Sequence, residues 1–182
     1  MNARALVGAC FVIGLMIALA GTVQAGGAHL YGKVGIDANG EYDDPLTFVD
    51  RLVYQGGLDV GIIDMLTIGP EISYQRISGE LEEFGLTDKY TVSIFGIFGN
   101  LRLEVPGDLP AKPYGGVGVG AMHVGVDQKI EGFQFDESVT KAAIQGFGGA
   151  VFGGHFLAEV KIVHMFVEDA DTDIWVNFGV RF

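Results

Sequence analysis

The stretch IWVNFGVRF, residues 174–182, has an apolar side chain at every second position. The even-numbered positions are all apolar, and the odd-numbered positions 177, 179 and 181 hold asparagine, glycine and arginine. Because successive side chains of a β-strand point to opposite faces, this stretch predicts a strand with one apolar and one polar face.

The same alternation recurs along the chain in eight stretches. They lie at about 30–36, 52–62, 66–74, 95–103, 114–122, 141–151, 156–162 and 174–182, and the sixth has the least clear phase. The segments between them alternate in length, with long ones at 39–50, 78–89, 125–139 and 167–173 and short ones at 63–65, 105–112 and 152–155. Long connections at one end and short turns at the other are typical of outer-membrane barrels. The sequence therefore predicts an all-β fold, an eight-stranded antiparallel transmembrane up-and-down β-barrel over residues 26–182.

The polar faces of these stretches carry five bases and five acids, which cancel in formal charge. An equal balance suits an enclosed space, where an unpaired charge is costly. A row of glycines, Gly116, Gly118 and Gly120, shares the polar face and would leave room in a narrow lumen for long side chains. We therefore predict that lipid meets the apolar face and that the lumen is filled by ion pairs rather than open. The predicted lumen ionic network is Lys33, Asp37, Arg51, Asp59, Glu71, Arg102, Glu104, Glu159, Lys161 and Arg181.

Residues 1–25 have the features of a secretory signal peptide. Arg4 supplies a positive charge, an apolar run spans 5–20, and Val23-Gln24-Ala25 resembles a cleavage site. Cys10, the single cysteine, would leave with this segment, so the mature chain would contain no thiol. The expected location is the cell outer membrane, after cleavage of the signal peptide.

The net charge of −12 belongs mainly to the four long connecting segments. They hold 16 of the 23 acidic residues and two lysines, a sum of −14. This balance excludes nucleic acid as an expected partner, because phosphate backbones need clustered Lys and Arg. Hard divalent cations favour clustered carboxylates, and the candidate loop cation contacts are Asp43, Asp44, Glu82, Glu83, Asp136, Glu137, Glu168 and Asp169. Simple solvation of the acidic loops is the alternative explanation.

Several motifs resemble those of the OmpA/OmpX-like small outer-membrane barrels. They are the segments 100–103 (NLRL) and 112–120 (KPYGGVGVG) and the turn 106–108 (PGD). The resemblance covers nearly all of residues 26–182, and the chain end resembles the signal read by the barrel assembly machinery, through Trp175, Phe178, Gly179, Val180 and Phe182. It implies export, insertion by that machinery and contact with outer-membrane lipid and lipopolysaccharide. It does not imply one activity, because such folds host many functions.

No motif in the sequence predicts a catalytic site, a metal site or a cofactor. The four histidines lack metal-ligand spacing, and the glycine-rich runs lack the spacing of a nucleotide-binding loop. We therefore predict a monomer with a structural or surface-interaction role that is not an enzyme. One alternative is a lipid A deacylase, although His164 is followed by Met165 and Phe166 rather than by the serine that such a site needs. The other is a soluble periplasmic lipocalin-like binder, whose apolar face would point inward.

Overall fold

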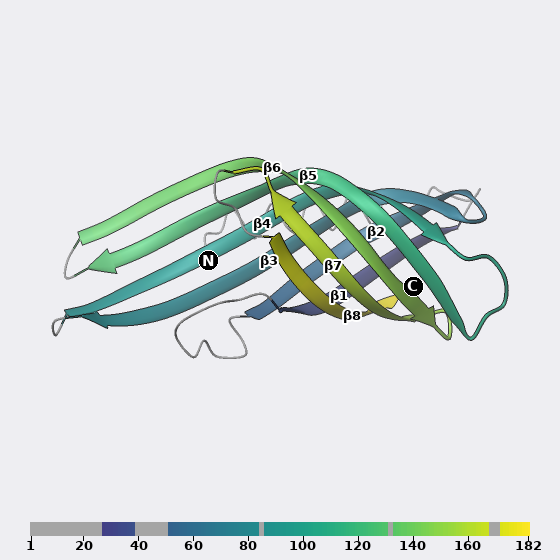
Figure 1. The fold of residues 1–182 in the computed structure, drawn as a ribbon, viewed down its shortest axis with the longest axis horizontal. Helices are drawn as coiled ribbons and strands as arrows, with labels where there is room; N and C mark the ends of the chain where they lie inside the picture. Colours follow the sequence, from purple (N-terminus) through teal and green to yellow (C-terminus); the bar gives the residue numbers. More distant parts are fainter. Residues whose placement is uncertain (1–26, 39–50, 84–85, 131–132, 168–171) are drawn as a thin grey trace.

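The computed structural model describes residues 27–38, 51–83, 86–130, 133–167 and 172–182, so the predicted signal peptide lies outside the described residues. Eight strands form one closed barrel in chain order (Figure 1). The strands are β1 (Ala28–Asp37), β2 (Leu52–Ile63), β3 (Leu66–Glu83), β4 (Leu86–Glu104), β5 (Ala111–Ile130), β6 (Phe133–Phe152), β7 (Phe156–Met165) and β8 (Thr172–Arg181). No helix in the described residues is long and apolar enough to cross a membrane.

Every strand pairs antiparallel with its neighbours, and β1 pairs with β8 to close the barrel. The closing register sets Val34 opposite Phe178 and Lys33 opposite Gly179. The short connections lie at one end, between β2 and β3, β4 and β5, and β6 and β7. The predicted eight-stranded up-and-down topology is therefore confirmed.

The side chains alternate between the lumen and the outer surface along each strand. On β5, Val119 is 67% exposed on the outer surface while Met122, on the opposite parity, is buried. On β6, the strand with the least clear predicted phase, the odd-numbered residues Ala143, Gln145 and Phe147 are buried. The outer surface of the barrel is thus apolar and its interior holds the charges, the reverse of a soluble lipocalin-like barrel.

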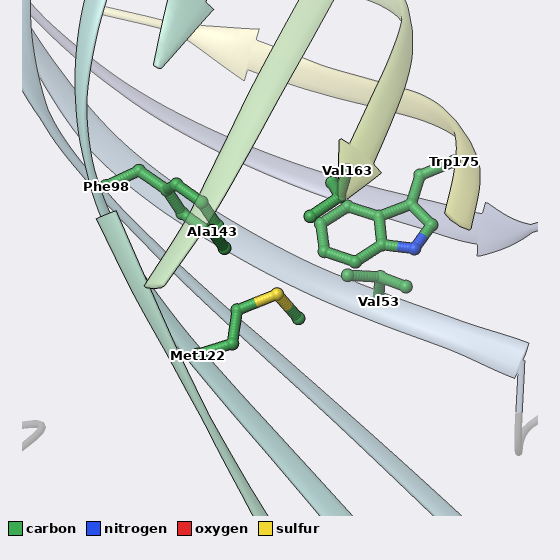
Figure 2. Packing of buried hydrophobic residues seen from close by; sticks show 6 residues of the cluster. All are labelled: Val53, Phe98, Met122, Ala143, Val163 and Trp175. Carbon is green, nitrogen blue, oxygen red and sulfur yellow. The ribbon is translucent and has the colours of Figure 1, made fainter. Parts of the chain in front are cut away.

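Two apolar clusters close the lumen. The first contains Val53, Phe98, Met122, Ala143, Val163 and Trp175 (Figure 2). The second contains Tyr31, Tyr114, Phe147, Val151 and Leu157. Along β7 the inward residues run from Val163 through Lys161 and Glu159 to Leu157, so the polar layer lies between the two clusters. The lumen is filled along its length, as expected for a barrel of eight strands.

Residues 78–83, 86–89, 125–130 and 133–139 lie in strands rather than in the loops predicted from the sequence. Strands β3 and β4 pair as far as Glu83 and Leu86, and β5 and β6 as far as Ile130 and Phe133. The pairing of β2 with β3 ends at Gln75, and that of β7 with β6 ends at Ala143. Four strands therefore project beyond the barrel as one sheet, which extends to the left in Figure 1. The prediction failed because each strand was ended where the apolar alternation of the barrel ends, although a strand that continues into water can exchange the polarity of its two faces.

Candidate functional sites: the lumen and the projecting sheet

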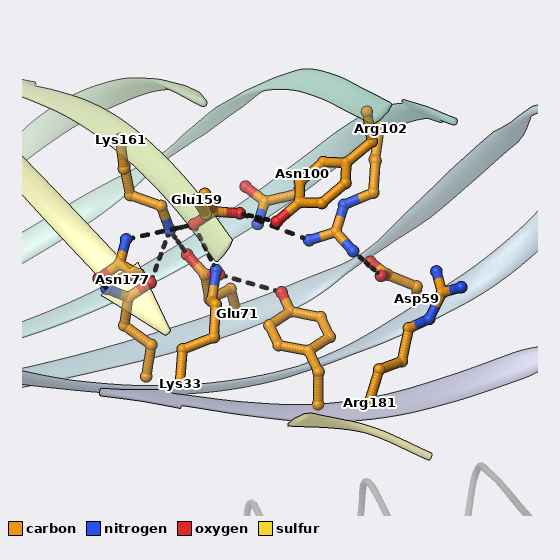
Figure 3. A network of polar contacts seen from close by, with 12 residues as sticks. Lys33, Asp59, Glu71, Asn100, Arg102, Glu159, Lys161, Asn177 and Arg181 are labelled. Carbon is orange, nitrogen blue, oxygen red and sulfur yellow. Dashed lines mark hydrogen bonds and ion pairs between the residues drawn. The ribbon is translucent and has the colours of Figure 1, made fainter. Parts of the chain in front are cut away.

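Glu71 is the centre of the lumen network. Its Oε2 accepts hydrogen bonds from Lys33 Nζ at 2.7 Å and from Tyr31 OH at 3.0 Å. Its Oε1 accepts from Lys161 Nζ and from Gln145 Nε2. One carboxylate from β3 thus joins side chains of β1, β6 and β7 across the interior (Figure 3).

Glu159 is the second anion of this layer. Lys33 Nζ donates to its Oε1 at 2.7 Å, and Asn177 Nδ2 donates to the same oxygen at 3.3 Å. The hydroxyl of Tyr114 donates to Oε2 at 3.1 Å. Lys33 therefore bridges two glutamates, and all of these side chains are buried.

Arg102 forms a further ion pair, with Asp59. Its Nη1 lies 2.5 Å from Asp59 Oδ2. The guanidinium also lies over three aromatic rings, those of Tyr114, Tyr31 and Phe147, at 4.5, 5.1 and 5.5 Å from their centroids. The charge therefore meets ring faces as well as a carboxylate, an attractive arrangement away from water.

Six of the ten residues predicted for the ionic network form this cluster. They are Lys33, Asp59, Glu71, Arg102, Glu159 and Lys161. Three cations face three anions, so the cluster is neutral in formal charge. Such a buried cluster holds the strands in register, because removing one partner leaves an uncompensated charge.

The other four predicted members are not part of this cluster of six. Glu104 and Arg181 form a separate pair nearer the short-turn end, with Nη1 to Oε2 at 2.5 Å. Asp37, near the opposite end of β1, accepts from Gln75 Nε2 at 3.5 Å. Arg51 precedes β2 and is half-buried. Alternation predicts the face of the strand on which a residue lies. It does not predict the position of that residue along the barrel axis or the partner that it contacts.

Tyr31, Tyr114 and Gln145 belong to the network and were missed from the sequence. Tyr31 is two residues before Lys33 and shares its face, which was the signal that could have identified it. Gln145 donates to both Glu71 Oε1 and Asn100 Oδ1, at 3.0 and 2.7 Å. It was missed because the phase of its strand was unclear from the sequence.

Gly118 shows why the lumen contains glycines. A Cβ at this position would fall on Asn100 Oδ1 and lie 2.9 Å from Gln145 Cγ. At Gly116 it would meet the Phe147 ring. The glycine row therefore makes room for side chains that cross from neighbouring strands, a packing reason rather than a conformational one.

The chain end that resembles an assembly signal divides between the two faces of β8. Trp175 is buried in the first apolar cluster, and Gly179 packs against Lys33. Phe178, Val180 and Phe182 are exposed on the outer surface, Phe182 at 73%. The aromatic and aliphatic side chains on that surface are accessible to another protein or to lipid.

The sequence predicts that the candidate cation contacts lie in loops, but four of them lie in strands. Glu82 and Glu83 belong to β3, and Asp136 and Glu137 belong to β6. The remaining four, Asp43, Asp44, Glu168 and Asp169, lie outside the described residues. No group of three or more His, Cys, Asp or Glu side chains that could hold a metal ion occurs in the described part of the chain.

The projecting sheet reverses the polarity of the barrel. On the face that continues the lumen it carries mainly apolar side chains, which are Val92, Val124, Val126, Phe135 and Val139, together with Glu137 and Lys141 of β6. The face that continues the lipid-facing surface carries Arg76, Ser93, Asp127, Asp136 and Ser138. Phe135 and Val139 are 54% and 40% exposed. A polar outer face and an apolar inner face are what a sheet requires once it leaves a bilayer and stands in water.

Comparisons with known proteins agree on the fold. Neither a protein-family model nor a curated protein sequence matches this chain. Among solved structures it is similar to Ail, the attachment invasion locus protein of Yersinia pestis, in a crystal structure with the heparin analogue sucrose octasulfate. The two chains are 13% identical, the match covers 85% of this chain and 96% of that chain, and the TM-score is 0.55. It is also similar to Neisserial surface protein A, with 11% identity, 85% and 94% coverage, and a TM-score of 0.53. The chain has the fold of the small eight-stranded outer-membrane β-barrels of the OmpA/OmpX-like type.

Proposed function

We propose that this protein is an integral outer-membrane barrel whose projecting sheet binds partners at the cell surface. The observation that carries the proposal is the pair of open edges on the projection. Among the described residues, β2 pairs with β3 only as far as Gln75, and β7 pairs with β6 only as far as Ala143, so no described strand flanks the projecting parts of β3 and β6 on their outer sides. A sheet edge of this kind can take an extended segment of another chain as an added strand.

The barrel beneath the projection supports a role as an anchor rather than as a pore. Its outer surface is apolar, and its interior is closed by two apolar clusters with a neutral ionic layer between them. In hydrocarbon, strands satisfy their backbone groups only in a closed barrel. We propose that the chain inserts as a monomer, with help from the barrel assembly machinery that reads its last strand.

The acidic segments at the projecting end suit contact with lipopolysaccharide through divalent cations. Asp136 and Glu137 are exposed there on β6. Carboxylates and lipid phosphates can share hard cations such as Mg²⁺. Neutralising all eight candidate carboxylates should abolish any magnesium-dependent rise in thermal stability; an unchanged magnesium response would refute cation bridging.

No catalytic activity forms part of this proposal. The ring of His164 shares a hydrogen bond with Thr172 Oγ1 at 3.2 Å and meets the Phe166 ring edge to face. We therefore expect overexpression to leave the acylation pattern of lipid A unchanged in mass spectra. A loss of acyl chains would favour the deacylase alternative.

Cysteine labelling tests the orientation. The sequence beyond residue 25 has no cysteine, so a single introduced cysteine is the only thiol that a maleimide can label in that part of the chain. Ser138→Cys on the projection should react with a membrane-impermeant maleimide on intact cells. Asp108→Cys, in the exposed turn between β4 and β5, should react only after the outer membrane is permeabilised. The reverse labelling pattern would refute the proposed orientation.

A model strand tests the interaction surface. A basic alternating peptide, acetyl-(Val-Lys)₄-amide, should shift backbone NMR signals of residues 133–141, because Asp136 and Glu137 would attract its lysines. Asp136→Lys combined with Glu137→Lys should remove the shifts. Shifts confined to the β1–β2 side would refute binding at this edge.

A further inference from the structure

A polar cluster, formed by Arg76, Ser93 and His123, lies on the outer surface at the base of the projecting sheet. Arg76 of β3 is directly opposite Ser93 of β4, and Phe95 of β4 is directly opposite His123 of β5. Side chains at opposite positions of an antiparallel sheet are about 5 Å apart, and those at diagonal positions about 7–8 Å. Arg76 and His123 therefore border the same patch of β4, between Ser93 and Phe95.

The residues of this cluster point away from the lumen. Gln75 and Ile77, the neighbours of Arg76 in the chain, are buried, and so is Met122, the neighbour of His123. Arg76 and His123 are themselves exposed. Because successive residues of a strand face opposite sides, Arg76 and His123 share the side of the sheet that continues the apolar outer surface of the barrel.

The cluster offers hydrogen-bond donors without a neighbouring carboxylate. Among the described residues, no ion pair involves the guanidinium group of Arg76. His123 Nδ1 shares a hydrogen bond with Thr140 Oγ1 at 2.8 Å. When Nδ1 accepts from the threonine hydroxyl, the N–H of the neutral ring is on Nε2 and can donate to a ligand.

The charge around the cluster favours an anion. None of the neighbours of Arg76 and His123 on the same face of β3 to β6 is acidic, although the whole chain carries a net charge of −12. Asp127 and Asp136 are outward-facing acids of the described sheet, and they lie opposite each other farther along the projection. The guanidinium of Arg76 is therefore free to pair with a negatively charged ligand.

The position of the cluster along the strands indicates which ligand reaches it. On the barrel side, the next outward residues are Tyr74, Phe95 and Ile97, which are 41%, 36% and 50% exposed. On the projection side, the next outward residues are Ser78 and Thr91. The cluster therefore lies at the boundary between the apolar belt and the polar surface, with aromatic rings just below it, which is the level of lipid headgroups.

We propose that Arg76, Ser93 and His123 bind the phosphate group of an outer-leaflet lipid whose acyl chains lie against Phe95 and Ile97. The guanidinium of Arg76 donates two parallel hydrogen bonds to phosphate oxygens, and the Ser93 hydroxyl and the His123 imidazole donate to the remaining oxygens. The Phe95 ring contacts the first carbons below the headgroup. The proposal rests on the membrane placement proposed above and adds a specific lipid ligand to it.

The test uses the refolded full-length mature chain in neutral dodecylmaltoside micelles. The probes are dioleoyl phosphatidic acid, dioleoylglycerol with the same chains and no phosphate, and inorganic phosphate. Native mass spectrometry measures lipid binding, and imidazole NMR signals report on His123 at the site and on His29 at the short-turn end of β1. Phosphatidic acid should bind and shift the His123 signal, and the His29 signal should not move.

The matched variants are Arg76→Gln in the cluster and Lys141→Gln, which removes a cation at the base of the projecting sheet on the face that continues the lumen. Arg76→Gln should weaken phosphatidic acid binding about tenfold, the effect of one charge-assisted hydrogen bond, and Lys141→Gln should leave it unchanged. Equal affinity of the parent and Arg76→Gln, or equal binding of dioleoylglycerol, would overturn the proposal. Inorganic phosphate binding as tightly as phosphatidic acid would overturn the lipid as the source of the phosphate.

Insertion into phosphatidylcholine vesicles is measured on the same preparations by heat-dependent gel mobility, which also shows whether each variant is folded. A protein that inserts but does not distinguish phosphatidic acid from dioleoylglycerol refutes the headgroup site alone. A protein that does not insert refutes the membrane placement itself.

Discussion

Val119→Arg is the sharpest test of which face of the barrel meets lipid. Val119 is 67% exposed on β5, between Gly99 and Ile144 on the neighbouring strands. It is four residues from His123, where polar outward side chains begin. At ~3.4 Å per residue and a tilt of about 40°, this separation is about 10 Å along the membrane normal, near the middle of a ~25 Å apolar band.

An arginine at that depth should destabilise the folded barrel by about 2–4 kcal/mol. On a surface in water the same substitution would change stability by about 0.5 kcal/mol or less. The assay is guanidinium unfolding in phosphatidylcholine vesicles, followed by the fluorescence of Trp175, the single tryptophan, which is buried when folded. Ser138→Arg on the projection is the matched control. A Val119→Arg midpoint and slope equal to those of the parent would refute the outward orientation of the apolar face.

Three further outcomes are expected. Glu71→Gln removes the carboxylate charge shared by Lys33 and Lys161 and should lower the free energy of unfolding by about 3–5 kcal/mol in the same assay. A decrease of less than about 1 kcal/mol would contradict a coupled network. Gly118→Leu should cost about 1–3 kcal/mol by overpacking, whereas Gly146→Leu should be tolerated, because a Cβ there meets nothing within 4 Å. The parent protein should produce no conductance steps in planar bilayers, and steady conductance would show that the lumen is open.

Much of the barrel follows from side-chain alternation. Strand count, order and the inward position of residues such as Lys33 and Glu159 follow from parity, because a strand has only two faces. Parity does not give the position of a residue along the barrel axis or its ion-pair partner, so the pairing of Glu104 with Arg181 was not predicted. It also failed where the phase was ambiguous, so Gln145 was missed.

The projecting sheet was not predictable in the same way. The polarity of each face reverses near His123 and Thr140, where the environment of the outer surface changes from hydrocarbon to water. Because the strands were ended where the apolar alternation of the barrel ends, the reversed segments were counted as connections.

The sequence by itself determined the eight strands, their faces and the neutral charge of the interior, because each of these depends on local alternation and composition. The tertiary structure decided which charges touch, where the lumen is sealed and how far β3 to β6 extend beyond their neighbours. Those features depend on the register and length of paired strands, which arise from contacts between segments distant in the chain and leave no periodic signal within any one of them.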